Sequence, residues 1–339
     1  MGRQAGSTRR PAPGPAAAQD PGGLPAWVQP QLATLTKDRF SDPAWIFERK
    51  LDGERCLAFR GRSQGVRLLT RNQHDVTNTF PEIAAALDAQ RMDGFIVDGE
   101  IVAFADEQTK FEQLQQRLGV AHPEAKLIDK FPVFYYIFDV MYADGRDTRP
   151  LPELDRKGLL AGALSFGGPL RYTEHRMGDG EAFYRSACQQ GWEGLIAKRA
   201  DAPYQAGRTR NWLKFKCLAG QEFVIGGYTD PRGSRQGLGA LLLGYYDTAG
   251  RLTYAGKVGT GFTNEMLLRL QALLEPLERD APPFERGNPP RAGVHWVEPR
   301  LVGEIAFAEW TDDGLLRQPR FQGLRDDKDA SEVVRETPQ

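Results

Sequence analysis

The chain has 339 residues, of which 40% are hydrophobic and 26% are charged, and its formal net charge is −1. This length is sufficient for two domains with a core each. No apolar run approaches the roughly 18 residues that span a bilayer, and no signal-peptide core is present, so we expect a soluble intracellular protein without membrane contact.

A low-complexity segment comes first, and a mixed pattern follows it. Residues 1–25 are rich in Pro, Ala and Gly, which is typical of a disordered tail. Residues 26–218 alternate short β-prone runs with helical ones and indicate an α+β domain with antiparallel sheets. The predicted strands are Trp45–Phe47, Cys56–Arg60, Arg67–Thr70, Phe95–Phe104 and Val133–Val140, and the predicted helices are Glu82–Gln90, Phe111–Leu118 and Gly180–Gln190.

Residues 219–335 favour an all-β second domain. Five short strand patterns with one helix indicate an OB-fold barrel, an architecture that often binds nucleic acid. The strand patterns are Phe223–Thr229, Ala240–Asp247, Leu252–Val258, Val294–Val297 and Leu301–Trp310, and the helix is Asn264–Leu277. The glycine in Leu218–Gly220 could serve as a hinge between the domains.

The cysteines and histidines give no metal or disulfide pattern. Cys56, Cys188 and Cys217 are scattered along the chain and lack metal-ligand spacing. We therefore expect neither a disulfide scaffold nor a zinc site.

The segment Lys50-Leu51-Asp52-Gly53-Glu54-Arg55 lies between two strand-like runs. An Asp-Gly pair in this position is first a hairpin signal, with the lysine on the surface. Later segments add lysines, carboxylates and an aromatic residue that suit a phosphate, a metal and a base. These segments are Asp98-Gly99-Glu100, Phe138-Asp139, Glu193-Gly194-Leu195-Ile196-Ala197-Lys198 and Lys214-Phe215-Lys216.

Each of these motifs also has a plain structural interpretation. Lys214 and Lys216 would share one face of a strand, where they could bind a phosphate or form an exposed basic edge. They belong to an acid-free run, Gln205 to Gln221, that suits either nucleic acid or a solvated face. An aromatic such as Phe138 in an apolar strand is usually core, and Trp212 and Phe215 are expected there.

The motifs resemble, in the same order, those of the covalent nucleotidyltransferases and specifically of ATP-dependent DNA ligases. The ligase domain of bacterial non-homologous end-joining ligases is the most similar branch. The family's opening motif, Lys-x-Asp-Gly-x-Arg, is matched by Lys50, Asp52, Gly53 and Arg55. Its closing motif resembles Arg317–Phe321 followed by Gly323–Lys328, and the resemblance spans Trp27 to Lys328.

The resemblance implies an enzyme that seals nicks between a 3′-OH and a 5′-phosphate through a lysyl-AMP and a DNA-adenylate, in double-strand-break repair. Lys50 would be the nucleophile that receives AMP from ATP. Because an amine attacks only when deprotonated, we expect neighbouring cations and Mg²⁺ to lower the pKa of Lys50.

The resemblance also assigns the rest of the site. Glu48 would contact the adenine amino group, Phe138 would stack on the base, and Arg71 would meet the nick phosphate. Glu193 and Glu100 would hold Mg²⁺ or Mn²⁺. For Asp52 and Asp98 two interpretations stay open: a role in the site, or a hydrogen bond from the carboxylate to the local backbone. The full set of implied ATP-binding residues is Glu48, Arg55, Arg71, Glu100, Phe138, Lys198, Lys214, Lys216, Arg325 and Lys328.

Arg325 and Lys328 would close over the pyrophosphate when the second domain swings toward the first. The alternative for these two residues is a charged carboxyl-terminal tail.

Other classes of protein remain open at this point. An RNA ligase or an RNA-capping guanylyltransferase would share the lysine chemistry, although Glu48 and the Arg317–Lys328 ending favour adenine and DNA. A non-catalytic nucleic-acid-binding module is the rival from a different class. It is opposed by the intact lysines and carboxylate of the motifs: Lys50, Glu193, Lys214 and Lys216. NAD-dependent ligases are excluded because the chain lacks room and cysteines for their extra modules.

The implied partner is nicked or broken duplex DNA. The family comparison also suggests Ku and polymerase or phosphoesterase repair proteins, although no residue shows these contacts. We expect a monomer in the bacterial cytoplasm, associated with the nucleoid. The net charge of −1 gives no overall basic footprint, so DNA binding would depend on how the charges are distributed.

Overall fold

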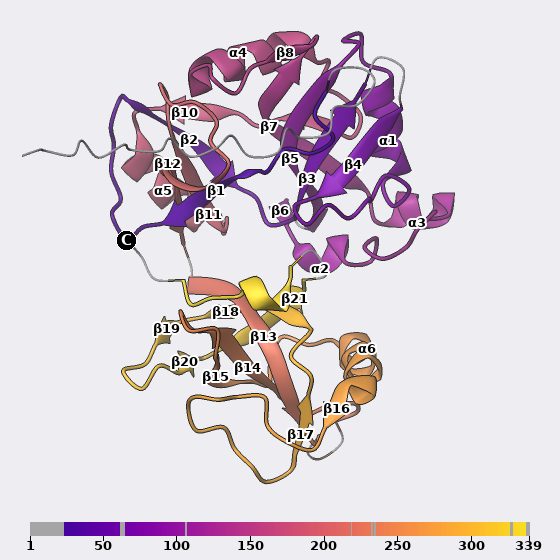
Figure 1. Cartoon of the computed structure of the whole chain (residues 1–339), viewed down its shortest axis with the longest axis vertical. Coiled ribbons are helices and arrows are strands. Elements are labelled where there is room, and N and C mark those ends of the chain that lie inside the picture. Colours follow the sequence, from indigo (N-terminus) through magenta and orange to yellow (C-terminus); the bar gives the residue numbers. More distant parts are fainter. Residues whose placement is uncertain are drawn as a thin grey trace, which may run out of the picture.

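The computed structural model describes residues 24–61, 65–105, 107–217, 219–231, 233, 235–325 and 328–336. Residues 24–217 form an amino-terminal body, and residues 219–336 form a carboxy-terminal body beside it (Figure 1). The segment expected to be a disordered tail lies outside the described residues apart from Leu24 and Pro25, and Leu24 is buried. No helix in the described ranges is long and apolar enough to cross a membrane.

One sheet of the amino-terminal body has the strand order β4-β3-β5-β7-β8. Its long central strands, β5 (Phe95–Ala105) and β7 (Val133–Ala143), pair antiparallel. The other members are β3 (Glu54–Arg60), β4 (Val66–Thr70), β6 (Gln108–Thr109), β8 (Arg146–Asp147) and β9 (Leu170–Tyr172). Helices α1 (Pro81–Asp88), α2 (Phe111–Leu114) and α4 (Glu153–Ala163) contribute buried leucines to the core on this sheet.

The second sheet of this body has the order β1-β12-β11-β2-β10. Its strands are β1 (Gln31–Leu35), β2 (Trp45–Lys50), β10 (His175–Met177), β11 (Gly194–Arg199) and β12 (Gly207–Lys216). Alternate residues of β2, β11 and β12 bury their side chains against helix α5 (Gly180–Gln189): Phe47, Leu195, Ala197, Leu213 and Phe215. The side chains between them therefore face away from α5.

The chain passes from one sheet to the other at Asp52–Gly53. Strand β2 belongs to the second sheet and β3 to the first, so the hairpin suggested by the Asp-Gly pair is wrong. A Cβ at Gly53 would lie 2.2 Å from the carbonyl oxygen of Ile101, so this crossing requires glycine. Lys50 and Arg55 consequently lie on different sheets, on either side of the crossing.

The carboxy-terminal body is a curled sheet of an OB-fold, as expected. Its long first strand, β13 (Ala219–Thr229), pairs with β14 (Leu241–Tyr246), β17 (Val294–Val297) and β18 (Val302–Phe307). Strands β15 (Leu252–Val258), β16 (Glu278–Arg279) and β21 (Arg320–Leu324) extend it, and β19 (Glu309–Trp310) and β20 (Leu316–Arg317) form a separate pair. Helix α6 (Asn264–Leu274) starts at Thr263, whose hydroxyl accepts a hydrogen bond from the amide of Met266.

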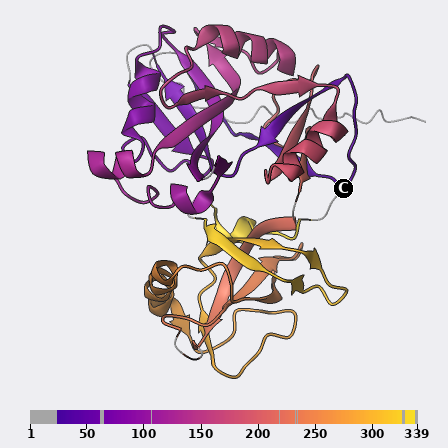
Figure 2. The same cartoon turned by 180° about the vertical axis from the view of Figure 1, so that it is seen from behind.

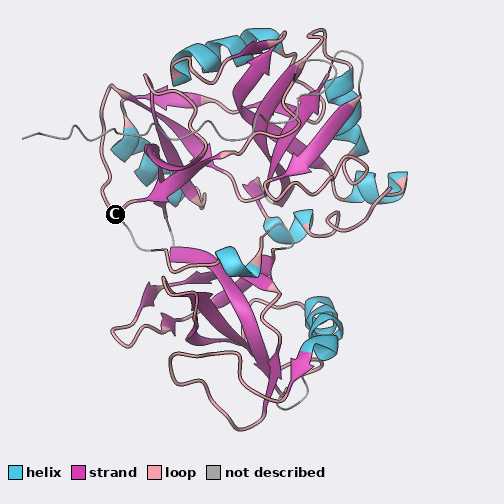
Figure 3. Ribbon diagram, viewed as in Figure 1, coloured by secondary structure: helices cyan, strands magenta, loops and turns pink. Residues whose placement is uncertain are grey.

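Three short helices complete the described elements: α3 (Ala125–Lys130) and the 3-10 turns Glu275–Leu277 and Ala330–Glu332. The helices lie at the periphery and the strands in the interior of both bodies (Figure 3). The predicted helix Phe111–Leu118 is helical only to Leu114. Helix α4 escaped prediction because its buried face includes charged Glu153, Arg156 and Lys157, which hides the apolar period.

The sequence predicted no disulfide, and this prediction is wrong. Cys188, at the end of α5, and Cys217, directly after β12, form a disulfide with a Cα–Cα distance of 5.3 Å. Their 29-residue separation carries no pairing signal, and only the packing of α5 on β12 brings them together. Cys56 is a buried free thiol.

Candidate active site

The predicted site residues converge between the two sheets and the carboxy-terminal body. A cavity of about 200 Å³ is lined by Glu48, Lys50, Phe138 and Lys198, and from the other body by Arg325 and Lys328. A smaller cavity of about 100 Å³ adjoins it, and its lining includes Lys50, Glu100, Glu193, Lys214 and Lys216. Figure 2 shows from behind how the carboxy-terminal body abuts this side of the amino-terminal one.

Strand register brings four of these side chains onto one surface. Lys50 and Lys216 both lie opposite Gly194, on either side of β11. Glu48 and Lys214 lie opposite Ile196 in the same way. Because residues two apart on a strand share a face, all four side chains project from the face opposite α5.

Lys50 forms an ion pair with Glu193. Its Nζ lies 2.5 Å from Oε2 of Glu193, which directly precedes β11. Burial disfavours the charged amine, but the Glu193 carboxylate outweighs burial and raises the pKa of Lys50. In this arrangement the pKa of Lys50 therefore shifts opposite to the expected direction, because the Glu193 carboxylate contacts the amine directly. A Cβ at Gly194 would lie 1.8 Å from the carbonyl oxygen of Phe215, so glycine allows Glu193 this position.

Lys214 and Lys216 share one carboxylate as their partner. Lys214 Nζ lies 2.5 Å from Oε1 of Glu336, and Lys216 Nζ lies 3.6 Å from its Oε2. The two lysine side chains are only 13% and 10% exposed, so they do not form an exposed basic edge. Burial, with repulsion from Lys216, lowers the pKa of Lys214 to about 8. Burial opposes the charge of Lys216 too, but Glu336 and neighbouring carboxylates raise its pKa.

Phe138 lines the larger cavity between two cations. The guanidinium carbon of Arg55 lies 4.5 Å from the centre of its ring, and Nζ of Lys198 lies 4.8 Å from it. Trp212 packs edge-on against the same ring with a centroid distance of 6.0 Å. Phe138 is mostly buried, and it also presents a surface to the cavity. Trp212 and Phe215 are buried, as expected from the sequence.

Glu48 is held by two lysines at the base of this pocket. Its carboxylate oxygens lie 2.7 Å from Lys157 Nζ and 2.9 Å from Lys198 Nζ. Lys198 also lies 3.0 Å from Glu153, which in turn pairs with Arg156. All of these side chains are at most 3% exposed.

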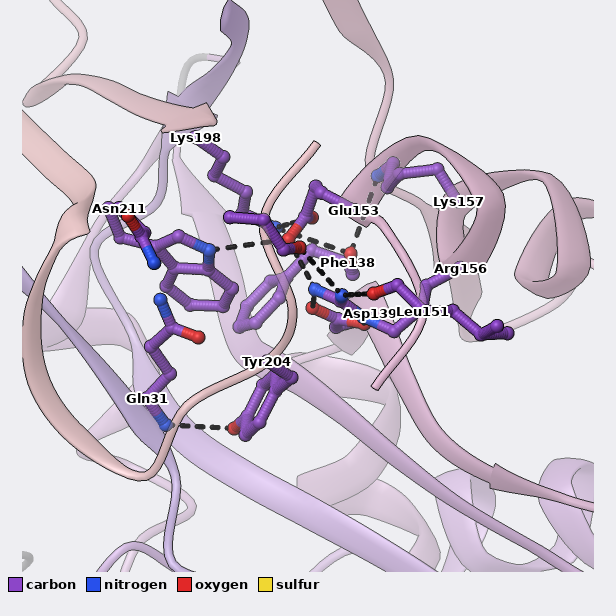
Figure 4. Close-up of polar contacts among 12 residues, drawn as sticks. Gln31, Phe138, Asp139, Leu151, Glu153, Arg156, Lys157, Lys198, Tyr204 and Asn211 are labelled. Atoms are coloured by element: carbon purple, nitrogen blue, oxygen red, sulfur yellow. Dashed lines mark hydrogen bonds and ion pairs between the residues drawn. The ribbon is translucent and has the colours of Figure 1, made fainter. Parts of the chain in front are cut away.

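Arg156 closes this network with a bidentate contact to Asp139 at 2.7 and 2.9 Å. Figure 4 shows Lys198, Glu153, Arg156 and Asp139 pointing toward one another beside Phe138. Three cations and three carboxylates therefore neutralise one another in the buried network, which also includes Glu48 and Lys157. Burial, with repulsion from Asp139, raises the pKa of Glu153 to about 7. Sequence reasoning missed Lys157, Glu153 and Arg156 because α4 itself was missed.

The facing sheet supplies Arg55, Asp98 and Glu100. Arg55 binds Asp98 through two nitrogens at 2.5 and 2.6 Å, and the hydroxyl of Tyr204 donates to Asp98 at 2.6 Å. Asp98 is thus a buried partner of Arg55 rather than a residue that bonds its own backbone. Glu100 lies opposite Arg55 in the β-ladder and lines both cavities. Burial, with repulsion from Glu193, raises the pKa of Asp52 to about 6.

The remaining predicted residues line the cavity where the two bodies meet. Arg71 pairs with Glu332 at 3.2 Å, and Lys328 lies 3.6 Å from Glu222. Arg325 lies over the ring of Phe111 at 4.7 Å, so it is part of a domain contact rather than of a free tail. Asp326 and Asp327, between these two basic residues, lie outside the described residues. Glu336 was not predicted, because an isolated Glu carries no motif.

The smaller cavity has the donor set of a hard cation. Carboxylates of Glu193, Glu100, Asp52 and Glu304 line it, and Mg²⁺ prefers such oxygens together with substrate phosphates and water. No three His, Cys, Asp or Glu residues in the described part of the chain form a metal cluster by themselves. The residues therefore fit a Mg²⁺ ion that would be held partly by these carboxylates and partly by the oxygens of a bound phosphate.

Family profiles agree with this arrangement. The profile described as ATP dependent DNA ligase domain matches residues 30–216, and the profile described as ATP dependent DNA ligase C terminal region matches residues 234–328. The chain belongs to the ATP-dependent DNA ligase family. The sequence resemblance is thereby confirmed, and so is the pairing of a nucleotidyltransferase fold with an OB-fold.

Two curated members of the ligase family are multifunctional non-homologous end joining proteins named LigD. The chain is 38% identical to the protein from Pseudomonas aeruginosa, over 98% of this chain and 40% of that protein. It is also 38% identical to the protein from Mycobacterium tuberculosis, over 91% of this chain and 40% of that one. The chain thus spans about two fifths of the length of these relatives.

A solved ligase structure covers nearly the same length as this chain. It is the mycobacterial DNA ligase D complexed with ATP and MES, which is 36% identical and has a TM-score of 0.65. The similarity covers 91% of this chain and 98% of that one.

Proposed function

We propose that this chain is an ATP-dependent DNA ligase that seals nicks between a 3′-OH and a 5′-phosphate. The observation that carries the proposal is the convergence of Lys50, Lys214 and Lys216 on one face of the second sheet, beside the Phe138 pocket. Membership of the ligase family supports the reaction class. Because the curated relatives are much longer than this chain, similarity to part of them does not assign their full activity to it.

In the first step Lys50 Nζ attacks the α-phosphorus of ATP, and pyrophosphate leaves as the lysyl-AMP bond forms. Glu193, 2.5 Å away, is placed to accept the ammonium proton before the amine attacks. Lys214 and Lys216 would stabilise the charge that develops on the transferred group. When bound at Glu193 and Glu100, Mg²⁺ (or Mn²⁺) would neutralise phosphate charge.

The same site would then transfer AMP to the 5′-phosphate of the nick, and attack by the 3′-OH would release it. Arg71, in the lining of the larger cavity, is the candidate contact for the nick phosphate. Arg325 and Lys328 would serve the first step from the other body. Opening of the two bodies would then admit duplex DNA.

Base selection follows from the charges in the pocket. Phe138 offers a face for stacking, and Glu48 offers a carboxylate that can accept from the adenine amino group. Guanine has a carbonyl oxygen at that position and would meet repulsion from Glu48. Arg55 and Lys198, beside the same ring, complete the proposed nucleotide contacts.

The first test is the mass of the intact protein after incubation with ATP and Mg²⁺. Wild type stripped with pyrophosphate should gain one AMP from ATP and nothing from GTP or NAD. Lys50→Ala should gain nothing, while Lys126→Ala, at an exposed lysine of α3, should behave as wild type. If stripped wild type gains no nucleotide under any condition, a non-catalytic binding module replaces the ligase proposal.

Substrate choice separates DNA ligase from RNA ligase. The adenylated protein should join a labelled nick in duplex DNA faster than the same nick in duplex RNA. Preference for RNA would favour the RNA ligase alternative, and a GTP adduct in the mass experiment would favour a capping enzyme.

The relatives' names support a role in double-strand-break repair. We extend the proposal to broken duplex DNA as substrate, to Ku and polymerase or phosphoesterase proteins as partners, and to a monomer at the bacterial nucleoid. Stimulation of end joining by Ku is the measurement that checks this extension.

A further inference from the structure

The segment from Ala330 to Glu336 runs back from the carboxy-terminal body into the cleft between the bodies. Its backbone is fixed at three points by hydrogen bonds. The Tyr246 amide donates to the Val333 carbonyl at 2.8 Å, and the Gln221 side chain donates to the Val334 carbonyl at 3.3 Å. The Glu336 amide donates to the Gln221 side-chain oxygen at 3.0 Å. The position of Glu336 is therefore set by the fold rather than by its charge alone.

The carboxylate of Glu336 occupies the place between Lys214 and Lys216. Its Oε1 lies 2.5 Å from Lys214, its Oε2 lies 3.6 Å from Lys216, and the side chain is 16% exposed. Oε2 is buried without a hydrogen bond among the described residues, so it has unused acceptor capacity. Burial disfavours the charge of Glu336, but the two lysines outweigh it and lower its pKa to about 2. Two anionic oxygens facing two ammonium groups reproduce the pattern that a phosphate would present.

Glu336 also limits the space in the site. It lines both the 200 Å³ cavity next to Phe138 and the 100 Å³ cavity next to Glu193. Sites for small molecules usually measure about 300–1,000 Å³. Glu336 belongs to the lining that the two cavities share, so movement of this side chain would enlarge the space beside the lysines.

We propose that Glu336 is an internal ligand of the anion subsite formed by Lys214 and Lys216, which the phosphates of a nucleotide must displace. This inference rests on the proposed function of these lysines. It assigns the segment Val333–Glu336 the role of a competitor that holds the bodies together while no nucleotide is bound. Displacement by phosphate would break the Glu336 contacts between the bodies, so nucleotide binding would be coupled to release of this segment.

Adenylation kinetics of Glu336→Gln test the competition. The variant keeps the length and the amide hydrogen bond to Gln221 and loses the charge that binds Lys214. We expect its KM for ATP to fall roughly tenfold, the order of a charged hydrogen bond, with kcat within about twofold of wild type. If the Glu336 contact were merely structural, the substitution would lower the free energy of unfolding or kcat and would not lower the KM for ATP.

Glu332→Gln is the matched control, because Glu332 lies in the same segment and pairs with Arg71 instead of the two lysines. Its KM for ATP should remain that of wild type. An unchanged or higher KM in Glu336→Gln overturns the inference, as does an equal fall in both variants. Absence of any adenylation in wild type refutes the proposed function instead.

Hydrogen exchange of the segment gives a readout that needs no catalysis. Saturating tripolyphosphate should speed amide exchange in residues 330–336 of wild type, because the anion replaces Glu336 on the lysines. Glu336→Gln should exchange faster than wild type without the anion and should change less when the anion is added. If tripolyphosphate binds wild type and leaves exchange in this segment unchanged, the anion does not displace Glu336 and the inference fails.

Discussion

Lys214 and Lys216 are separated by one residue and point to the same carboxylate, yet their pKa values shift in opposite directions. Burial, with repulsion from Lys216, lowers the pKa of Lys214 to about 8, whereas Glu336 and other carboxylates raise the pKa of Lys216. The two lysines are therefore unequal near neutral pH. Lys216 is a permanent charge, and Lys214 is the one that titrates.

We predict that anion affinity falls as the pH rises above about 8. Below that pH, Lys214 is already charged in the free protein, and binding of an anion needs no proton. Above it, binding must draw a proton onto Lys214, which costs up to a factor of about ten in affinity per pH unit. Calorimetric titration with tripolyphosphate between pH 7 and 10 measures this slope.

Lys214→Arg serves as the control for that titration, because a guanidinium stays charged throughout this range. The variant should show a flatter profile than wild type, while titration of the probe itself affects both proteins equally. Identical slopes in the two proteins would show that Lys214 does not carry the pH dependence.

At the scale of elements, the end of β12 is fastened at two points, one of them the backbone of Glu193, the carboxylate partner of Lys50. The amide of Cys217 donates to the carbonyl oxygen of Glu193 at 2.9 Å, and the Cys188–Cys217 disulfide fastens the same point to α5. Strand β12 carries Lys214 and Lys216. The disulfide thus lies directly beside the part of the sheet on which the proposed chemistry depends.

Removal of this disulfide should lower the free energy of unfolding by about 3–4 kcal/mol, the value that loop-closure entropy gives for a loop of 29 residues. Denaturant unfolding of the Cys188→Ser/Cys217→Ser double variant measures it. Reductant should destabilise wild type by a similar amount and leave the variant unchanged. Equal midpoints for wild type and variant without reductant would contradict the prediction.

Side chains alternate between the two faces of a strand, and this rule determines which part of the site could be predicted from the sequence. Spacings of two, in Glu48-x-Lys50 and Lys214-x-Lys216, place side chains on one strand face whatever the pairing. Which strands become neighbours is set by non-local packing, so the register of Lys50 with Gly194 could not be derived. The Asp52–Gly53 crossing was misread as a hairpin because both start with the same local signal.

The charged members of the site network were the hardest to anticipate. Lys157 and Arg156 are buried only because Glu48 and Asp139 meet them from other elements, while Glu153 pairs with Arg156 from one turn earlier in α4. In a single sequence such residues are typical of an exposed helix face. Glu336 was missed for a related reason, since its two partners lie more than a hundred residues earlier in the chain.

At the scale of the molecule, the two bodies meet through contacts of different kinds. At α2 and β21, the Gln115 side chain donates to the carbonyl oxygen of Leu324 at 2.7 Å in a buried, uncharged contact. At the cleft, Lys214 pairs with Glu336 and Arg71 with Glu332. The first contact is insensitive to ions, whereas the second set is electrostatic.

We predict that salt opens the cleft while the contact between α2 and β21 persists. The more exposed Arg71–Glu332 pair weakens as the screening length falls to about 3 Å near 1 M salt, and the more buried Lys214–Glu336 pair weakens less. The radius of gyration from small-angle scattering should therefore rise with salt in the nucleotide-free protein. Glu336→Gln should be more open at low salt and respond less to added salt, and a radius independent of salt in wild type would contradict this prediction.

The position of Glu336 has a practical consequence for engineering. The described part of the segment ends at Glu336 in the cleft itself, beside Lys214. A fluorophore placed there would change its surroundings whenever the cleft empties or fills. The carboxyl end of the segment is accordingly the place to install an optical reporter of nucleotide arrival, and a poor place for a bulky affinity tag.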